Sequence, residues 1–315
     1  MLSTLLCSAA LLAGCGKHAA PAKTPAPPRL GFSDAQASNA LHAVADFVTA
    51  CTPRDAGTPG AEKAALWLRD RLATNGLEAA VDRFEDATPR GPRTFFNVLA
   101  DIPGSGDEWI LLLSHFDTMS GIGDGFQGAN DGGSSTGLLL ELASVLRASG
   151  PRPFNVLCAF LDGEECMLGY SDRDGFHGSK RLAAAMKRQG RAIRAVILMD
   201  MVGDRDLKLT MPANCTPALR VLALDAAEAV GARDKIGLFD GYVYDDHQAF
   251  YDLGYPAVNL IDFSYGSRAG ENDYWHTTQD TLDKLSADSL HTTGRIVAEM
   301  INRLESAPAR AQPAR

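Results

Sequence analysis

Apolar residues follow two distinct rhythms along this chain. Continuous apolar runs of about five to eight residues are typical of strands that are buried on both faces of a sheet. These runs lie at 109–114, 154–161, 195–199 and 257–261. Longer segments have apolar residues at helical spacing, and they lie at 34–50, 58–73, 134–148, 178–189, 216–230, 246–253 and 286–304. Strands and helices therefore alternate over most of the chain.

Local signals support the first of these elements. Ser33 precedes the first helix, where a serine hydroxyl can accept a hydrogen bond from a free backbone N–H group. Thr58 and Pro59 begin the second helix, and proline is tolerated there because its missing N–H would have no partner. Two further segments, 78–84 and 96–102, are also strand-like.

The alternation of strands and helices predicts an α/β fold, specifically a three-layer sandwich with a mixed, mainly parallel central sheet flanked by helices. No linker-like stretch interrupts residues 32–305, so we expect a single domain over that range. Ligands of open α/β sheets bind beyond the carboxyl ends of the strands. The side chains that follow each strand are therefore the first candidates for chemistry.

The N-terminal residues have a different composition. Residues 2–14 are small and apolar, and the run ends in Leu-Ala-Gly followed by Cys15. This resembles a bacterial lipoprotein signal, so we expect a signal peptide over 1–15 and a lipid on Cys15. Residues 16–31, rich in Ala, Pro and Lys, predict a disordered tether, and 306–315 a disordered tail. The protein would then be exported, membrane-anchored, and would face the periplasm or the cell exterior.

The amino-acid composition limits the kinds of partner that the protein is expected to bind. The chain has 315 residues, 45% of them hydrophobic, and a formal net charge of −9. This is the composition of a globular protein, and the acidic balance argues against nucleic acid or an anionic membrane surface as a partner. We expect a monomer that meets the membrane only through the lipid on Cys15. Export permits a disulfide among Cys51, Cys158, Cys166 and Cys215, although four cysteines are too few for a disulfide scaffold.

Candidate metal ligands and acids cluster after the apolar strands. The segment 115–117 follows one strand, Asp-Gly-Glu-Glu at 162–165 follows the next, and Asp200 follows a third. A glycine-rich turn at 128–133 and a Trp-His pair at 275–276 supply further groups. Because parallel strands end at the same edge of a sheet, we expect these groups to converge. Imidazole and carboxylate groups together are typical of catalytic zinc sites.

The adjacent carboxylates of Glu164 and Glu165 are the most informative pair. Like charges this close raise one another's pKa unless a cation or hydrogen bonds compensate. A divalent metal would resolve the conflict, with one glutamate as ligand and the other as acid or base. Taken alone, the pair could equally be two solvated side chains on a loop. The candidate ligands that follow the other strands are what favour a metal site.

The motifs together, in the order His-x-Asp, Asn-Asp-Gly, Asp-Gly-Glu-Glu, Asp and Trp-His, resemble the zinc exopeptidase superfamily of bacterial aminopeptidases and glutaminyl cyclases over residues 34–304. The resemblance implies that Asp131, Glu165 and His276 hold one zinc ion and that Glu164 is the general base. In aminopeptidase members a second zinc ion would be bound by His115 and Asp200 together with Asp131. Asp117 would orient His115 from behind.

Several local features are closer to the glutaminyl-peptide cyclotransferase branch. Asp-Asp-His at 245–247 matches the cyclases, whereas aminopeptidases usually have Ser-Asp-His. The resemblance to cyclases implies that Glu164, Asp200 and Asp245 form a hydrogen-bonded acid network beside a single zinc ion. Trp275 is also cyclase-like. Two positions depart from the cyclase pattern, because Tyr170 replaces a tryptophan and Tyr244 a glutamine. We expect these three aromatic residues to contact substrate.

The leading hypothesis from the sequence is a zinc-dependent glutaminyl cyclase that acts on the N-termini of peptides or proteins. A zinc aminopeptidase, with one or two zinc ions, remains an alternative because both ligand sets are intact. A third, lower-ranked hypothesis is a non-enzymatic binding domain, which would be expected to have lost ligands.

Overall fold

The computed structural model of the chain describes residues 27–306. Its strands are β1 (Ala79–Thr88), β2 (Gly91–Ile102), β3 (Trp109–His115), β4 (Asn155–Leu161), β5 (Ile193–Asp200), β6 (Leu209–Met211), β7 (Ile236–Leu238) and β8 (Ala257–Ile261). Its α-helices are α1 (Asp34–Cys51), α2 (Pro59–Thr74), α3 (Gly133–Ala148), α4 (His177–Arg188), α5 (Pro217–Ala229), α6 (His247–Tyr251) and α7 (Ala287–Ser306).

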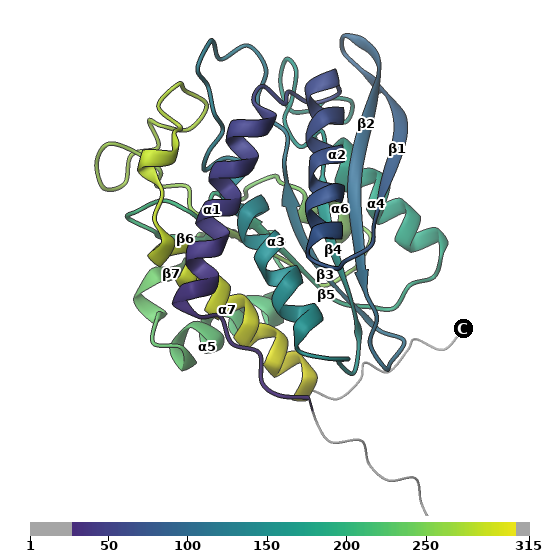
Figure 1. Cartoon of the computed structure of the whole chain (residues 1–315), viewed down its shortest axis with the longest axis vertical. Coiled ribbons are helices and arrows are strands. Elements are labelled where there is room, and N and C mark those ends of the chain that lie inside the picture. The colour runs from purple at the N-terminus through teal and green to yellow at the C-terminus, as the bar shows by residue number, and fades with distance from the viewer. Residues whose placement is uncertain (1–26, 307–315) are drawn as a thin grey trace, which may run out of the picture.

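The strands form one sheet in the order β1-β2-β4-β3-β5-β8-β6-β7 (Figure 1). The central neighbours β4, β3, β5 and β8 are parallel. The pairs β1–β2, β2–β4 and β6–β8 are antiparallel, and β7 is parallel to β6. The sheet is therefore mixed with a parallel centre, and the predicted α/β class is confirmed.

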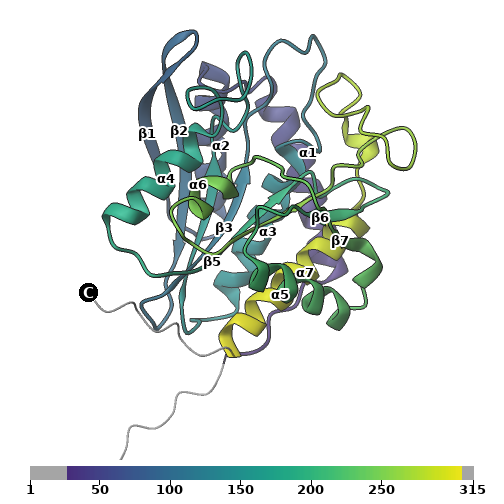
Figure 2. The same cartoon turned by 180° about the vertical axis from the view of Figure 1, so that it is seen from behind.

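Alternate residues of the central strands pack against different helix layers, because side chains of a strand point to opposite faces. On β3, Ile110 and Leu112 pack in a core cluster with α1, α2, α3, α5 and α7. Leu111 and Leu113 pack in a second cluster with α4 and α6. Figures 1 and 2, which view the molecule from opposite sides, show these two layers. The central strands are buried on both faces, as their continuous apolar runs predict.

The predicted start of α1 is confirmed in detail. The Ser33 hydroxyl accepts a hydrogen bond from the Gln36 N–H group, and the Gln36 side chain accepts one from the Ser33 N–H group. This reciprocal pair satisfies two backbone donors at the helix end. Thr58 caps α2 in a similar way, and Pro59 occupies its first turn.

Three strand features differ from the sequence prediction. The β1–β2 hairpin is longer than expected, because pairing continues to Thr88 and Gly91 through a stretch of mostly polar residues. Residues 209–211 and 236–238 also form strands, although each is too short to leave an apolar run. These two segments are strands because they pair with neighbouring strands, and not because of a pattern of apolar residues in the sequence.

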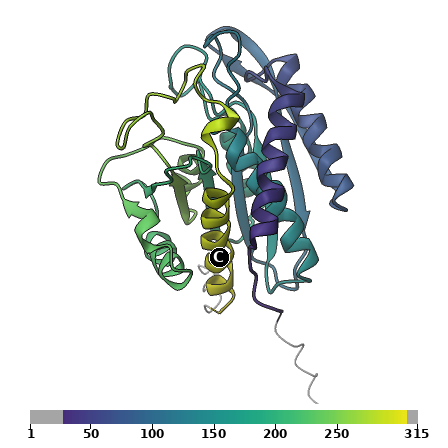
Figure 3. The ribbon, with the colours of Figure 1, turned by 60° about the vertical axis from the view of Figure 1, so that its left-hand side comes forward.

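The first and last helices of the described part lie side by side (Figure 3). Ahead of α1, the backbone of Leu30 exchanges two hydrogen bonds with the Asn302 side chain of α7, and Leu30 is buried. Packing therefore begins before residue 32, within the range predicted as a tether. The predicted signal peptide, Cys15 and most of the tether lie outside the described residues, as do tail residues 307–315.

The structure also bears on the predicted cysteine chemistry and on membrane-spanning helices. Cys51, Cys158, Cys166 and Cys215 are all buried with free thiols. Within residues 27–306, no helix combines the length and the apolar character needed to cross a membrane.

Candidate active site

Five of the predicted site residues meet at one edge of the sheet. His115 ends β3, Asp200 ends β5, and Glu164 and Glu165 follow closely after β4. Because β3, β4 and β5 are neighbouring parallel strands, their carboxyl ends bring these side chains together. Asp131 enters from the turn that precedes α3.

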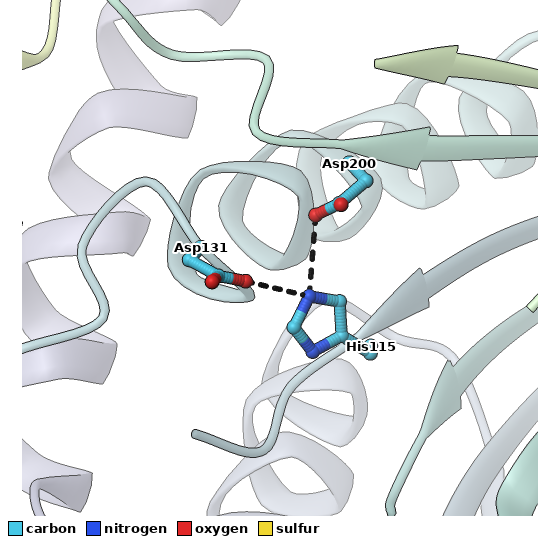
Figure 4. A group of neighbouring side chains, drawn as sticks. All are labelled: His115, Asp131 and Asp200. Atoms are coloured by element: carbon cyan, nitrogen blue, oxygen red, sulfur yellow. Dashed lines mark hydrogen bonds and ion pairs between the residues drawn. The ribbon is translucent and has the colours of Figure 1, made fainter. Parts of the chain in front are cut away.

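His115 faces two carboxylates with one ring nitrogen (Figure 4). Its Nε2 atom lies 3.1 Å from Oδ1 of Asp131 and 3.2 Å from Oδ1 of Asp200. Burial alone lowers the pKa of His115, but the carboxylates of Asp117, Asp131 and Asp200 outweigh burial and raise that pKa well above its usual value. The imidazole thus lies in a strongly negative environment.

His276 has the same relationship to a second pair of carboxylates. Its Nε2 atom lies 3.1 Å from Oε1 of Glu165 and 3.2 Å from Oδ2 of Asp131. The two carboxylates outweigh burial and raise the pKa of His276 to about 10. The His276 backbone has φ +53°, a strained conformation for a residue other than glycine. The fold therefore holds this side chain in place against a local preference.

Asp131 joins the two groups, because each of its carboxylate oxygens faces a different histidine. In each group, three potential ligand atoms lie within 4.8 Å of one another, from His115, Asp131 and Asp200 or from Asp131, Glu165 and His276. A single imidazole N–H can point at only one oxygen, yet each Nε2 atom faces two. This convergence of nitrogen and oxygen donors suits a divalent cation in either group.

Asp117 lies behind these groups and is fully buried. Its two oxygens accept hydrogen bonds from the backbone N–H groups of Glu164, at 3.2 Å, and Glu165, at 3.0 Å. Oδ1 of Asp117 is also 3.6 Å from Nδ1 of His115. Asp117 therefore links the end of β3 to the loop after β4, while its distance to the imidazole is longer than a hydrogen bond.

Glycine is required at two positions beside the candidate ligands. Gly132 has φ +73°, and a Cβ atom there would lie 2.8 Å from the Asp117 carbonyl oxygen and 3.0 Å from the His115 ring. Gly163 has φ +77°, and a Cβ atom would lie 2.7 Å from the Phe95 ring. Any side chain would force the turns away from the site.

Glu164 and Glu165 have different surroundings although they are adjacent. Burial, and then the charge of Glu165, raises the pKa of Glu164 well above its usual value. Burial and Asp131 raise the pKa of Glu165, and its contact with His276 limits the rise to about 7. The Tyr170 hydroxyl donates to Oε2 of Glu165 at 3.0 Å and lies 3.4 Å from Oε2 of Glu164. Within residues 27–306, no hydrogen bond or ion pair joins Glu164 to a histidine, which leaves its carboxylate available for proton transfer.

Asp245 is a buried acid near this pair. It is 2% exposed, and its Oδ2 atom accepts a hydrogen bond of 2.7 Å from Nδ2 of Asn259 in β8. Burial, followed by the charges of Asp200 and Asp246, raises the pKa of Asp245 well above its usual value. Glu164, Asp200 and Asp245 line one cavity, although no hydrogen bond joins these three carboxylates in the described part of the chain.

That cavity has a volume of about 1070 Å³ and opens above the candidate ligands. All three aromatic residues predicted to contact substrate line it, namely Trp275, Tyr170 and Tyr244. The Trp275 ring stacks on His276 with centroids 4.0 Å apart, and Tyr244 is exposed at the rim. Aromatic wall residues that the sequence analysis missed are Phe176, Phe239, Tyr242 and Phe263.

Two buried charged residues that contact the Asp131 turn were not predicted from the sequence, namely Arg54 and Asp280. Asp280 follows His276 by four residues, so an acid near a predicted ligand was a usable signal. Arg54 lies far from the site in sequence, and no local pattern marks it. Asn259, the partner of Asp245, sits within an apolar strand and was equally hidden.

The sequence and fold of this chain are similar to those of known proteins. The family model described as Peptidase family M28 matches residues 97–301. A solved glutaminyl cyclase from an Acidobacteriales bacterium is 35% identical with a TM-score of 0.82, over 92% of this chain and 99% of that chain. The bovine (Bos taurus) glutaminyl-peptide cyclotransferase-like protein is 27% identical over 277 residues, which cover 78% of this chain and 70% of the relative.

A leucine aminopeptidase precursor from Bacteroides thetaiotaomicron shares the fold with a TM-score of 0.75 at 22% identity, over 87% of this chain and 98% of that chain. The family model covers the strand ends and turns that carry every candidate ligand and acid described above. The fold, the order of the motifs and the convergence of the two histidine–carboxylate groups agree with that match. The chain therefore belongs to Peptidase family M28.

Proposed function

We propose that the protein is a zinc-dependent glutaminyl-peptide cyclotransferase, which converts an N-terminal Gln to pyroglutamate and releases ammonia. The observation that carries this proposal is the buried Asp245, which lines the cavity with Glu164 and is held by Asn259. A serine usually stands at this position in the aminopeptidases that the chain resembles. The similarity to a bacterial glutaminyl cyclase over nearly the whole chain supports the same activity.

Asp131, Glu165 and His276 would hold the zinc ion, since their ligand atoms converge and one imidazole with two carboxylates is a suitable donor set. When bound, zinc supplies Lewis acidity that polarises the γ-carbonyl group of the substrate glutamine.

Glu164 carries the proton transfers in this scheme. It takes a proton from the substrate α-amine, whose nitrogen forms a bond to the γ-carbonyl carbon. The bond from that carbon to the side-chain nitrogen then breaks, and Glu164 returns the proton to the departing ammonia. A carboxylate whose pKa is raised by burial is suited to both steps, because it accepts a proton more readily than an ordinary carboxylate does.

Asp200 and Asp245 would keep Glu164 poised for proton transfer through their negative charge. Trp275 and Tyr170 would exclude water from the reacting carbonyl, since attack by water gives hydrolysis instead of cyclisation. Tyr244 at the rim would contact residues of the peptide that follow the glutamine.

A zinc aminopeptidase is the second candidate, and one observation favours it. His115, Asp131 and Asp200 form a complete second group of ligand atoms. In that case two metal ions would share Asp131, and Glu164 would take its proton from water rather than from an amine. A non-enzymatic binding domain is disfavoured, because a domain without catalysis has no need for both groups.

One experiment separates the candidates. The purified protein is incubated with a peptide that begins with Gln and, separately, with a leucine anilide, and bound zinc is counted by elemental analysis. Ammonia release without peptide shortening, at one zinc ion per chain, supports the cyclase. Release of the N-terminal residue with two zinc ions per chain would sink the proposal in favour of the aminopeptidase.

We also propose that the protein is exported and anchored through a lipid on Cys15, on the strength of the apolar residues 2–14 that precede it. Expression of the full chain and of Cys15→Ser in a bacterial host with labelled palmitate tests this. Label in the parent chain and none in the variant is the expected result, and an unlabelled parent chain contradicts the proposal.

A further inference from the structure

Two buried charged side chains hold the turn that carries Asp131. Arg54 is completely excluded from solvent and donates to four carbonyl oxygens. Its Nε atom is 2.5 Å from the Phe116 oxygen, and Nη1 is 2.7 Å from the Gln127 oxygen. Nη2 is 2.6 Å from the Gly128 oxygen and 3.5 Å from the Asp131 oxygen. The guanidinium therefore ties the end of β3 to the turn before α3.

Asp280 binds the same turn through its N–H groups. Its Oδ1 atom accepts from the Asn130 N–H group at 2.7 Å, and Oδ2 accepts from the Asp131 N–H group at 3.1 Å. The Tyr265 hydroxyl donates to Oδ1 at 2.8 Å, and Asp280 is fully buried. The positively charged Arg54 thus binds carbonyl groups of the turn, and the negatively charged Asp280 binds its N–H groups.

The turn is packed directly onto the guanidinium. Gly128 has φ +55°, and a Cβ atom there would lie 2.9 Å from Nη2 of Arg54 and 2.5 Å from the Thr118 side chain. Among the described residues, no carboxylate forms an ion pair with Arg54. A charge buried without an ion pair is costly, so it persists where several well-placed hydrogen bonds offset that cost.

The position of the turn matters because both Asp131 oxygens face histidines, His115 on one side and His276 on the other. We propose that Arg54 and Asp280 are positioning residues that set the affinity of the site for its divalent cation by fixing the backbone of Asp131. This inference rests on the proposed metal site, but it does not depend on which reaction the site performs.

The main test is Asp280→Asn in the full chain, which removes the charge and one of the two acceptor oxygens. Zinc affinity is measured by competition with a chromophoric chelator, and the cobalt-substituted protein gives an absorption spectrum that reports ligand geometry. We expect zinc affinity to fall roughly 10- to 100-fold and the cobalt bands to change, as for other residues that orient metal ligands.

Asp262→Asn is the matched control. Asp262 is equally buried and also accepts from two backbone N–H groups, those of Lys208 at 2.7 Å and Ser264 at 2.9 Å, but neither group belongs to a candidate ligand or to a residue next to one. We expect this variant to lose thermal stability while its zinc affinity and cobalt spectrum match the parent protein. A purely structural role for Asp280 would make the two variants behave alike.

Arg54→Lys tests the other side of the turn, because lysine keeps the charge but cannot donate to all four of these widely spaced carbonyl groups. Its control is Arg152→Lys, a buried arginine that pairs with Glu305 away from the site. If Asp280→Asn does not fold, Tyr265→Phe removes only one donor to Asp280, and we expect a loss of zinc affinity of about 3-fold or more.

Parent-like zinc affinity and cobalt spectra in folded Asp280→Asn and Arg54→Lys would overturn the inference, and so would a parent protein that binds no divalent cation. A parent protein that binds zinc but does not cyclise Gln peptides refutes the proposed function alone. The inference still holds in that case if the two variants bind zinc more weakly.

Discussion

The Tyr170 hydroxyl lies 3.0 Å from Oε2 of Glu165, and it therefore links the cavity wall to a candidate metal ligand. The same hydroxyl reaches Oε2 of Glu164 at 3.4 Å. Burial and the charges of both glutamates raise the pKa of Tyr170, so the phenol keeps its proton and acts as a donor. We expected Tyr170 only to contact substrate, but its hydroxyl also donates a hydrogen bond to the carboxylates of the site.

Tyr170→Phe tests that role. Loss of a donor to ionised carboxylates should raise their pKa, because a hydrogen bond to a charged group is worth about 1.5–3 kcal/mol. We expect the acidic limb of the kcat/KM profile for a Gln peptide to move up by roughly one pH unit. Tyr242→Phe, which alters an exposed tyrosine of the same cavity, is the control. An unshifted profile in Tyr170→Phe would contradict the role.

The two adjacent glutamates should be separable by substitution. Glu164→Gln should lower kcat by about 10²- to 10⁴-fold, the usual contribution of a general acid or base, while bound zinc stays near the parent level. Glu165→Gln should lose zinc as well as activity, because its Oε1 atom faces His276 and its charge would be absent. Zinc counting beside steady-state kinetics checks both, and equal zinc loss in the two variants contradicts the assignment.

Asp245→Asn should lower cyclisation at least 100-fold without loss of zinc, because Asp245 lies outside both groups of ligand atoms but shares the cavity with Glu164. Asp252→Asn, which changes another carboxylate of the cavity wall, should keep activity within about twofold. Kinetics with a Gln peptide decide the matter. A variant that cyclises the peptide at the parent rate would contradict the role of Asp245.

Removal of the metal should make stability fall as pH rises. The pKa of Glu165 is raised from 4.5 to about 7, chiefly by burial, and that of His276 from 6.5 to about 10, where contacts with Asp131 and Glu165 outweigh burial. Both groups favour the protonated form in the folded protein. Their stabilisation is complete below the unfolded pKa values and is lost as pH rises through the folded ones. Metal-free protein should therefore melt several degrees lower near pH 9 than near pH 5.

Zinc should reverse this trend, because it takes the place of the protons that neutralise the site. The increase in melting temperature on adding zinc should be larger near pH 8 than near pH 5.5. Calorimetric scans with a chelator and with zinc across this range measure both effects. A metal-free melting temperature that climbs towards alkaline pH would be the contrary outcome.

Much of the site could be predicted because its residues sit at positions that simple patterns define. Apolar runs mark the buried strands, parallel strands end at one edge, and so His115, Glu165 and Asp200 had to meet there. Gly132 and Gly163 were recognisable as positions that let the backbone approach closely.

The sequence by itself thus determined the α/β class and the strand ends that carry candidate chemistry, because burial and periodicity are local properties of the chain. The resemblance of its motifs to a known superfamily supplied the set of candidate ligands. Only the tertiary structure decided that Asp131 faces both histidines and that Asn259 holds Asp245. It alone brought Arg54 and Asp280 to opposite sides of the Asp131 turn. Such contacts join residues far apart in sequence, and they depend on how the strands and loops pack in three dimensions rather than on any local pattern.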